Sequence, residues 1–147
     1  MAVRDAGSTT VLAFDFGEKR VGVAVGDLEV RIAHPLTTIA AEDNATRFAA
    51  IAKLVEEWRP RRFIVGLPMH ADGTEHELSR LARRFAHRLE GRFGHPAALM
   101  DERLTSRSAE TRLRESGARG QKIEDALDAA AAREILEAWF ESAGTQS

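Results

Sequence analysis

The sequence contains no cysteine and no long hydrophobic run. Without cysteine there is no disulfide framework, thiolate metal site or cysteine nucleophile, a composition that fits a reducing compartment. No apolar stretch approaches the ~20 residues of a membrane span. The first eight residues also lack the apolar segment of a signal peptide. These absences predict a cytoplasmic protein that does not enter a membrane.

The length of 147 residues favours one domain, because domains cluster around roughly 100–150 residues. A chain of this size buries about 70% of its unfolded surface, enough for a hydrophobic core without disulfides. We find no internal repeat or linker, and we therefore expect a single domain over residues 1–147, with frayed tails at 1–9 and 142–147. The oligomeric state stays open.

Charge is distributed unevenly along the chain. Residues 59–122 contain fourteen Lys and Arg against eight Asp and Glu, a net charge of +6, whereas the remainder carries −8. A basic middle segment in an acidic frame suggests an anionic partner such as nucleic acid. The alternative is that the arginine-rich helices simply face solvent.

Hydrophobic periodicity predicts an α/β domain. Residues 11–14 form a buried strand, and the alternation of Val21, Val23 and Val25 predicts a second strand beside it. A third strand over residues 30–39 contains Pro35, which favours an edge position. Further strands are expected at 63–67 and 97–100, and helices at 44–58, from a Thr74 cap to about residue 90, from 105 to 116, and from 123 to 141. This order predicts a five-stranded mixed sheet flanked by helices.

Acidic residues follow two of these strands. Asp15 ends the first strand, and Asp101 and Glu102 follow the last one. If the strands are parallel, their carboxyl ends meet at the sheet edge where α/β proteins bind ligands. Asp125 and Asp128 lie on the inward face of the last helix and bring a third carboxylate. The alternatives are a turn role for Asp15 and a helix-dipole role for the helix acids.

Three converging carboxylates without cysteine or histidine suit a hard cation. Mg²⁺ and Mn²⁺ both favour oxygen ligands. Two such ions about 4 Å apart assist phosphodiester hydrolysis by activating a water and stabilising the leaving oxygen. The acidic residues therefore suggest metal-dependent chemistry on a phosphate ester.

Four segments, in order, resemble the motifs of one family. Residues 12–27 read Leu-Ala-Phe-Asp-Phe-Gly-Glu-Lys-Arg-Val-Gly-Val-Ala-Val-Gly-Asp, and residues 65–75 read Val-Gly-Leu-Pro-Met-His-Ala-Asp-Gly-Thr-Glu. Residues 101–106 read Asp-Glu-Arg-Leu-Thr-Ser, and residues 122–132 read Lys-Ile-Glu-Asp-Ala-Leu-Asp-Ala-Ala-Ala-Ala, followed by Ile135 and Leu136. Together they resemble the YqgF-type "putative pre-16S rRNA nuclease" family, also described as Holliday-junction-resolvase-like.

The resemblance implies a ribonuclease H-like fold and a metal-dependent endonuclease. Matched position by position, Asp15, Glu102 and Asp128 become the catalytic residues and the ligands of Mg²⁺ or Mn²⁺, with Asp125 as the alternative helix ligand. The implied substrate is structured RNA, and the implied task is processing of the 5′ end of pre-16S rRNA in ribosome biogenesis. Departures from the expected motif fall at residues 69–71, in the loop after the fourth strand.

Other functions stay open on these residues. One is a resolvase of branched DNA (Holliday junctions), because the same carboxylates cleave either nucleic acid. Another is a non-catalytic nucleic-acid or transcription-associated factor. A sugar-kinase or actin-like ATPase needs two domains, and this chain has room for one. The basic residues expected to contact nucleic acid are Lys19, Arg20, Arg80, Arg84, Arg88, Arg103, Arg107 and Arg119.

Overall fold

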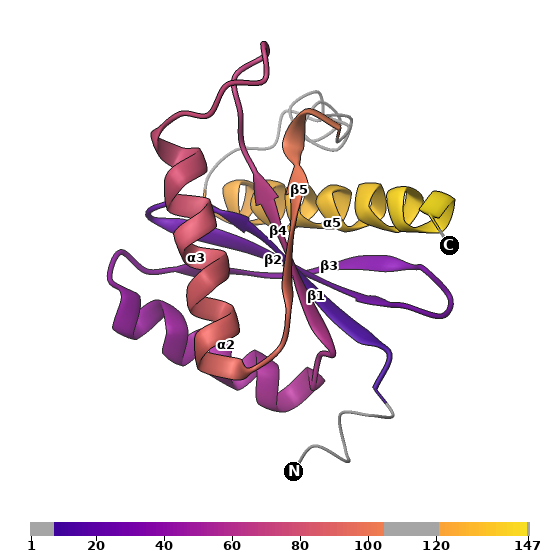
Figure 1. The fold of residues 1–147 in the computed structure, drawn as a ribbon. Helices are drawn as coiled ribbons and strands as arrows, with labels where there is room; N and C mark the ends of the chain where they lie inside the picture. The colour runs from indigo at the N-terminus through magenta and orange to yellow at the C-terminus, as the bar shows by residue number, and fades with distance from the viewer. Residues whose placement is uncertain (1–7, 105–120, 147) are drawn as a thin grey trace.

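A computed structural model describes residues 8–104 and 121–146 (Figure 1). The elements are β1 (Thr10–Phe16), β2 (Arg20–Asp27), β3 (Ala33–Ala40), α2 (Asn44–Trp58), β4 (Arg62–Leu67), α3 (Glu77–Phe93), β5 (Ala97–Asp101), the short 3₁₀ helix η1 (Glu102–Leu104) and α5 (Gln121–Gln146). The helix expected over residues 105–116 lies outside the described residues.

The five strands form one mixed sheet in the order β3-β2-β1-β4-β5. β2 pairs with β1 and β3 in antiparallel fashion, whereas β4 is parallel to β1 and β5 is parallel to β4. This arrangement confirms the predicted five-stranded sheet and its neighbours. It also brings the carboxyl ends of β1, β4 and β5 to one edge.

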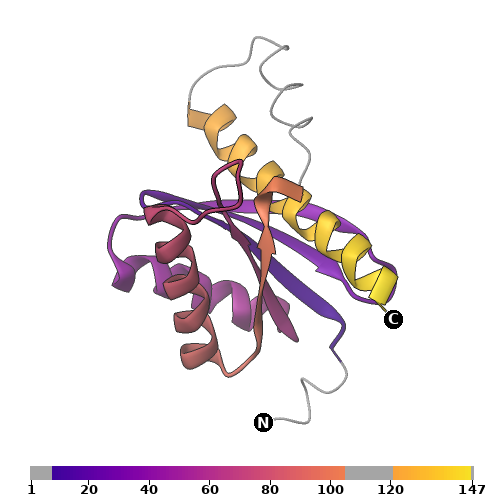
Figure 2. The same cartoon turned by 45° about the horizontal axis from the view of Figure 1, so that its top comes forward.

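Helices cover both faces of the sheet. α2 and α3 pack on one face, and α5 crosses the other (Figures 1 and 2). Side chains of β1 alternate accordingly: Phe14 and Phe16 belong to the core under α2 and α3, whereas Val11 and Ala13 belong to the core under α5. Asp15 therefore points toward α5.

Aromatic contacts organise the larger core. The Phe85 ring lies 5.5 Å from Phe14, 4.9 Å from Phe16 and 5.6 Å from Phe48, measured between ring centroids. Phe85 is 2% exposed. One α3 side chain thus joins β1 to α2 and fixes both helices against the strand that carries Asp15.

The structure shows which residues cap the starts of α2 and α3. Asp43 caps α2, because its carboxylate accepts the Thr46 N–H at 2.9 Å. The predicted Thr74 cap of α3 is wrong: His76 is the cap, and its Nδ1 accepts the Leu78 N–H at 3.3 Å. The Asp72 carboxylate accepts both the N–H and the hydroxyl of Thr74, which places Thr74 in the preceding turn.

The third strand is shorter than expected, and the last helix is longer. Residues 28–30 form a turn, followed by Arg31 with a φ of 58°, so β3 begins only at Ala33. Pro35 lies on this edge strand, as predicted. α5 continues past the expected end at residue 141 to Gln146. Throughout residues 8–104 and 121–146, the helices lack the combined length and apolar character needed to cross a membrane.

Candidate active site

Asp15 lies at the carboxyl end of β1, where three segments of the chain meet. In the antiparallel register it pairs with Gly22 of β2. The backbone of α5 crosses Gly22 at residue 128, so closely that a Cβ atom on Gly22 would lie 3.1 Å from the Ala129 nitrogen and would overlap the Asp128 carbonyl. A glycine is required at this crossing. It lets α5 bring Asp128 beside the strand that carries Asp15.

Glu102 reaches the same face from the other side. It follows β5 directly, and its carboxylate lies over Gly66 of β4, where a Cβ atom would be 2.7 Å from Oε2. Asp101, one residue earlier, pairs in register with Leu67 and instead binds Arg103, with Nη2 at 2.6 Å. Glu102 is therefore the carboxylate that turns toward Asp15, as the motif match implied.

The electrostatics of Asp15 identify these residues as one cluster. Burial raises the pKa of Asp15 well above its ordinary value, and the negative charges of Glu102 and Asp128 raise it further. A hydrogen bond between the Asp15 and Glu102 side chains acts in the same direction. The negative charges of these carboxylates therefore repel one another in the folded protein, because adjacent carboxylates cannot all ionise without a cost.

Arg20 pairs with the helix acids of the cluster. Its Nε and Nη2 each lie 2.7 Å from Oδ2 of Asp128, and Nη2 lies 3.7 Å from Oδ1 of Asp125. The Asp128 side chain is 30% exposed and that of Asp125 is 44% exposed. Arg20, predicted to contact nucleic acid, thus binds the helix acids in this structure.

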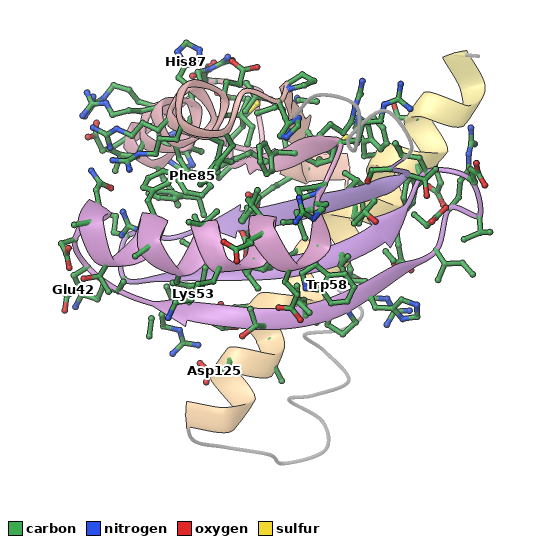
Figure 3. All side chains as sticks on the ribbon, turned by 90° about the horizontal axis from the view of Figure 1, so that it is seen from below. Glu42, Lys53, Trp58, Phe85, His87 and Asp125 are labelled. Carbon is green, nitrogen blue, oxygen red and sulfur yellow. The ribbon has the colours of Figure 1, made fainter. Side chains whose placement is uncertain are left out.

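The structure separates the remaining predicted basic residues. Lys19 lies in the turn between β1 and β2, and Arg103 pairs with Asp101 while its Nη1 lies 3.4 Å from the Ala71 carbonyl. Arg80, Arg84 and Arg88 belong to α3, on the sheet face opposite α5. Figure 3 shows this separation, with α3 on one side of the sheet and Asp125 of α5 on the other. Arg107 and Arg119 lie outside the described residues.

The three carboxylates can supply only oxygen ligands, the donor type that Mg²⁺ and Mn²⁺ favour. Within the described residues, no three His, Asp or Glu side chains lie close enough together to hold a metal ion in their present positions. Asp15 and Glu102 are hydrogen-bonded to each other, and Asp128 is bonded to Arg20. A cation held by these carboxylates would relieve their mutual repulsion.

Comparison with solved structures defines the class of fold. RuvC of Thermus thermophilus, solved alone and in complex with a Holliday junction substrate, matches with a TM-score of 0.56 in both structures. For the complex, sequence identity is 17%, over 93% of this chain and 97% of RuvC. The protein therefore has the ribonuclease H-like fold expected from the sequence.

Sequence comparison defines the family. Residues 9–142 match the family model RuvX, described as Holliday junction resolvase, and the chain belongs to this family of nucleases. A relative from Dechloromonas aromatica named "Putative pre-16S rRNA nuclease" is 60% identical over 90% of this chain and 91% of its own length. Proteins with the same name from Chromobacterium violaceum and Neisseria gonorrhoeae are 60% and 54% identical, over 91% and 90% of this chain and 98% and 87% of their own lengths.

Proposed function

We propose that this protein is a metal-dependent endonuclease that hydrolyses phosphodiesters of structured RNA, and that it acts in the cytoplasm on the 5′ end of pre-16S rRNA. The observation that supports this most is the position of Asp15. It is held at a strand end, and its pKa is raised by burial and by the charges of Glu102 and Asp128. Strongly shifted acids in such a place are typical of catalytic sites.

Asp15, Glu102 and Asp128 would hold one or two Mg²⁺ or Mn²⁺ ions. When bound, such ions make a water more nucleophilic and stabilise the charge that develops on the leaving oxygen. Asp15 would be the most rigidly held of these ligands, because it lies at the end of a central strand. Glu102 and Asp128 approach Asp15 from opposite sides: the Glu102 side chain lies over Gly66, and the backbone at Asp128 lies over Gly22.

Arg20 would change partners during this process. In the structure it neutralises Asp128 through two contacts of 2.7 Å. If Asp128 held a cation, the Arg20 guanidinium would bind a phosphate oxygen of the substrate, a favoured partner for arginine. This exchange accounts for both the predicted nucleic-acid contact of Arg20 and its observed ion pair.

Asp128 is proposed as the helix ligand in preference to Asp125. The charge of Asp128 contributes to the raised pKa of Asp15, and Asp125 is not among the groups that do so. Asp128→Asn should therefore lower single-turnover cleavage by a factor of at least about 10². Asp125→Asn, three residues away on the same helix, is the matched control and should retain most of the activity. Loss of activity in Asp125→Asn with retained activity in Asp128→Asn would instead assign the ligand role to Asp125, one helical turn earlier.

The substrate is tested with two labelled nucleic acids, a precursor RNA that spans the 5′ end of 16S rRNA and a four-way DNA junction. With Mn²⁺ present, the wild-type protein should cleave the RNA at a defined position and the junction much more slowly. Preferential cleavage of the junction would instead support a resolvase, the function named in the family description. Cleavage of neither would favour a non-catalytic nucleic-acid-binding factor.

A further inference from the structure

A cavity lies on the opposite face of the sheet from the acidic site. It has a volume of about 370 Å³ and opens between the start of α2 and the middle of α3. Its apolar floor includes Phe16, Leu81 and Phe85. Figure 3 shows Phe85 between α3 and α2, with Glu42 just before the start of α2. The cavity is large enough for a ligand of roughly one nucleotide, at the small end of the range for ligand sites.

Arg47 is a buried cation in the wall of this cavity. Its side chain is 5% exposed, and its guanidinium carbon lies 5.3 Å from the centre of the Phe16 ring. Nη2 donates to the carbonyls of Glu18 at 2.6 Å and Ala41 at 3.0 Å, and Nη1 donates to Asn44 at 2.8 Å. Nε is buried without a hydrogen-bond partner among the described residues. A buried guanidinium with an unsatisfied donor is costly unless an anion lies nearby.

Two arginines of α3 face Arg47 across the cavity. Arg84 and Arg88 are one helical turn apart, and both line the space. Burial and the charge of Arg88 lower the pKa of Arg47, whereas the carboxylates of Asp43 and Glu18 raise it. In the described part of the chain neither Arg84 nor Arg88 forms an ion pair, whereas Arg80 and Arg83 of the same helix pair with Glu77 and Glu75. The cavity therefore gathers three guanidinium groups, and none of them forms an ion pair with another described residue.

Acidic residues also line the cavity. Glu18, Glu42 and Asp43 line the cavity beside Asn44. Asp43 is already engaged in capping α2, which leaves the two glutamates to accept from a ligand. Guanidinium groups bind phosphate, and carboxylates commonly bind ribose hydroxyls. An anion alone would be repelled by the glutamates. A nucleotide can place its phosphate at the arginines and its ribose hydroxyls at the glutamates.

We propose that this cavity binds a nucleotide, with its phosphate at Arg47, Arg84 and Arg88 and its ribose hydroxyls at the glutamates. The nucleotide is either a free mononucleotide or the terminal nucleotide of a strand, since both present the same phosphate and ribose. The cavity faces away from Asp15, so binding here can be measured independently of cleavage. The proposal therefore stands or falls separately from the nuclease function.

The test is calorimetric titration of the full-length protein with AMP, GMP, CMP and UMP, and with adenosine and inorganic phosphate for comparison. At least one mononucleotide should bind, and its nucleoside should bind at least tenfold more weakly because the arginine contacts are lost. Inorganic phosphate should also bind more weakly than the mononucleotide. Equal binding of nucleotide and nucleoside, or no binding of any mononucleotide at millimolar concentration, would overturn the proposal.

Variants locate the site. Replacing Arg84 and Arg88 together by Gln should weaken mononucleotide binding at least tenfold, whereas the matched Arg80→Gln, Arg83→Gln protein should bind like the wild type. Arg47 is left intact because its hydrogen bonds hold the start of α2. Equal effects of the two double variants would overturn the proposal. So would loss of binding in Asp15→Asn, because the nucleotide would then occupy the acidic site.

Competition identifies the source of the nucleotide. A short single-stranded RNA with a 5′-phosphate is added to the mononucleotide complex, alongside the same RNA with a 5′-hydroxyl. Displacement only by the phosphorylated RNA assigns the cavity to a strand end. Displacement by neither, with intact mononucleotide binding, assigns it to a free nucleotide. Both results keep the cavity as a nucleotide site, whereas equal displacement by both RNAs would remove the role of the terminal phosphate and contradict the proposal.

Discussion

Substitution of Gly22 by alanine tests how closely α5 must approach the sheet. A methyl group at this position would overlap the Asp128 carbonyl oxygen and lie 3.1 Å from the Ala129 nitrogen. Both obstacles are helix backbone, so no side-chain rotation can relieve them. Because non-bonded heavy atoms prefer about 3.5–4.0 Å, the helix would have to retreat by more than about 1 Å. That movement would carry Asp128 away from Asp15.

The expected loss of stability is large for a single methyl group. Overpacking a well-packed interior costs about 1–3 kcal/mol, and a backbone obstacle places Gly22→Ala at about 3 kcal/mol or above. For a domain of this length, that corresponds to a fall in Tm of about 10 °C. Urea denaturation measures the change as a lower midpoint with an unchanged slope.

Gly91→Ala provides the matched control. This glycine lies in the last turns of α3, and a Cβ atom there would have no heavy atom within 4 Å. Alanine should therefore stabilise the protein by about 0.5–1 kcal/mol through its helix propensity. If Gly22→Ala unfolds within about 0.5 kcal/mol of the wild type, the range of an ordinary surface substitution, the close crossing of α5 over β2 is refuted.

Two further predictions concern charge and the core. The pKa of Asp15 is higher in the folded protein than in the unfolded chain. Protonation of Asp15 therefore stabilises the fold, fully at pH values below the unfolded pKa of about 3.9. This stabilisation is lost as the pH rises through the pKa that Asp15 has in the folded protein. Without divalent cations, Asp15→Asn should therefore melt at a higher temperature than the wild type at pH 7, and the difference should shrink toward pH 4; a pH-independent difference would contradict the raised pKa. Phe85→Ala, which removes the ring that contacts Phe14, Phe16 and Phe48, should cost about 3–5 kcal/mol in urea denaturation, and a loss below about 1 kcal/mol would show that the ring is not a core contact.

Local patterns in the sequence were sufficient to predict the strands of the sheet and the positions of Asp15 and Glu102 at strand ends. The apolar run before Asp15 and the short strand before Glu102 mark strand ends, and a parallel arrangement brings such ends together. The helical spacing of Ile135 and Leu136 with Asp128 indicates the inward face of α5, and those two residues are buried.

Contacts between distant parts of the chain could not be predicted in this way. Arg20 and Asp128 are 108 residues apart, and nothing in the local sequence of either one indicates the other. The requirement for glycine at position 22 likewise depends on where α5 crosses. Thr74 matched a capping pattern, but Asp72 binds it within a turn, and His76 takes the cap.

The face of the sheet on which the α3 arginines lie could have been predicted from the order of strands and helices. β1–α2–β4 and β4–α3–β5 are successive parallel crossovers that advance in the same direction across the sheet. Right-handed connections place both helices on one face. Arg84 and Arg88 therefore belong to the face opposite α5, and the basic character of residues 59–122 does not describe a single surface around the acidic site.

Single-turnover cleavage of the precursor RNA with Mn²⁺, compared between the wild type, Asp15→Asn and Asp101→Asn, tests the central claim most directly. Asp15→Asn preserves shape and removes the charge at the centre of the cluster, and it should reduce the rate by a factor of at least about 10³. Asp101→Asn alters a carboxylate that binds Arg103, and it should stay within about tenfold of the wild type. Wild-type cleavage by Asp15→Asn, or equal losses in the two variants, would contradict the assignment of the active site to Asp15, Glu102 and Asp128.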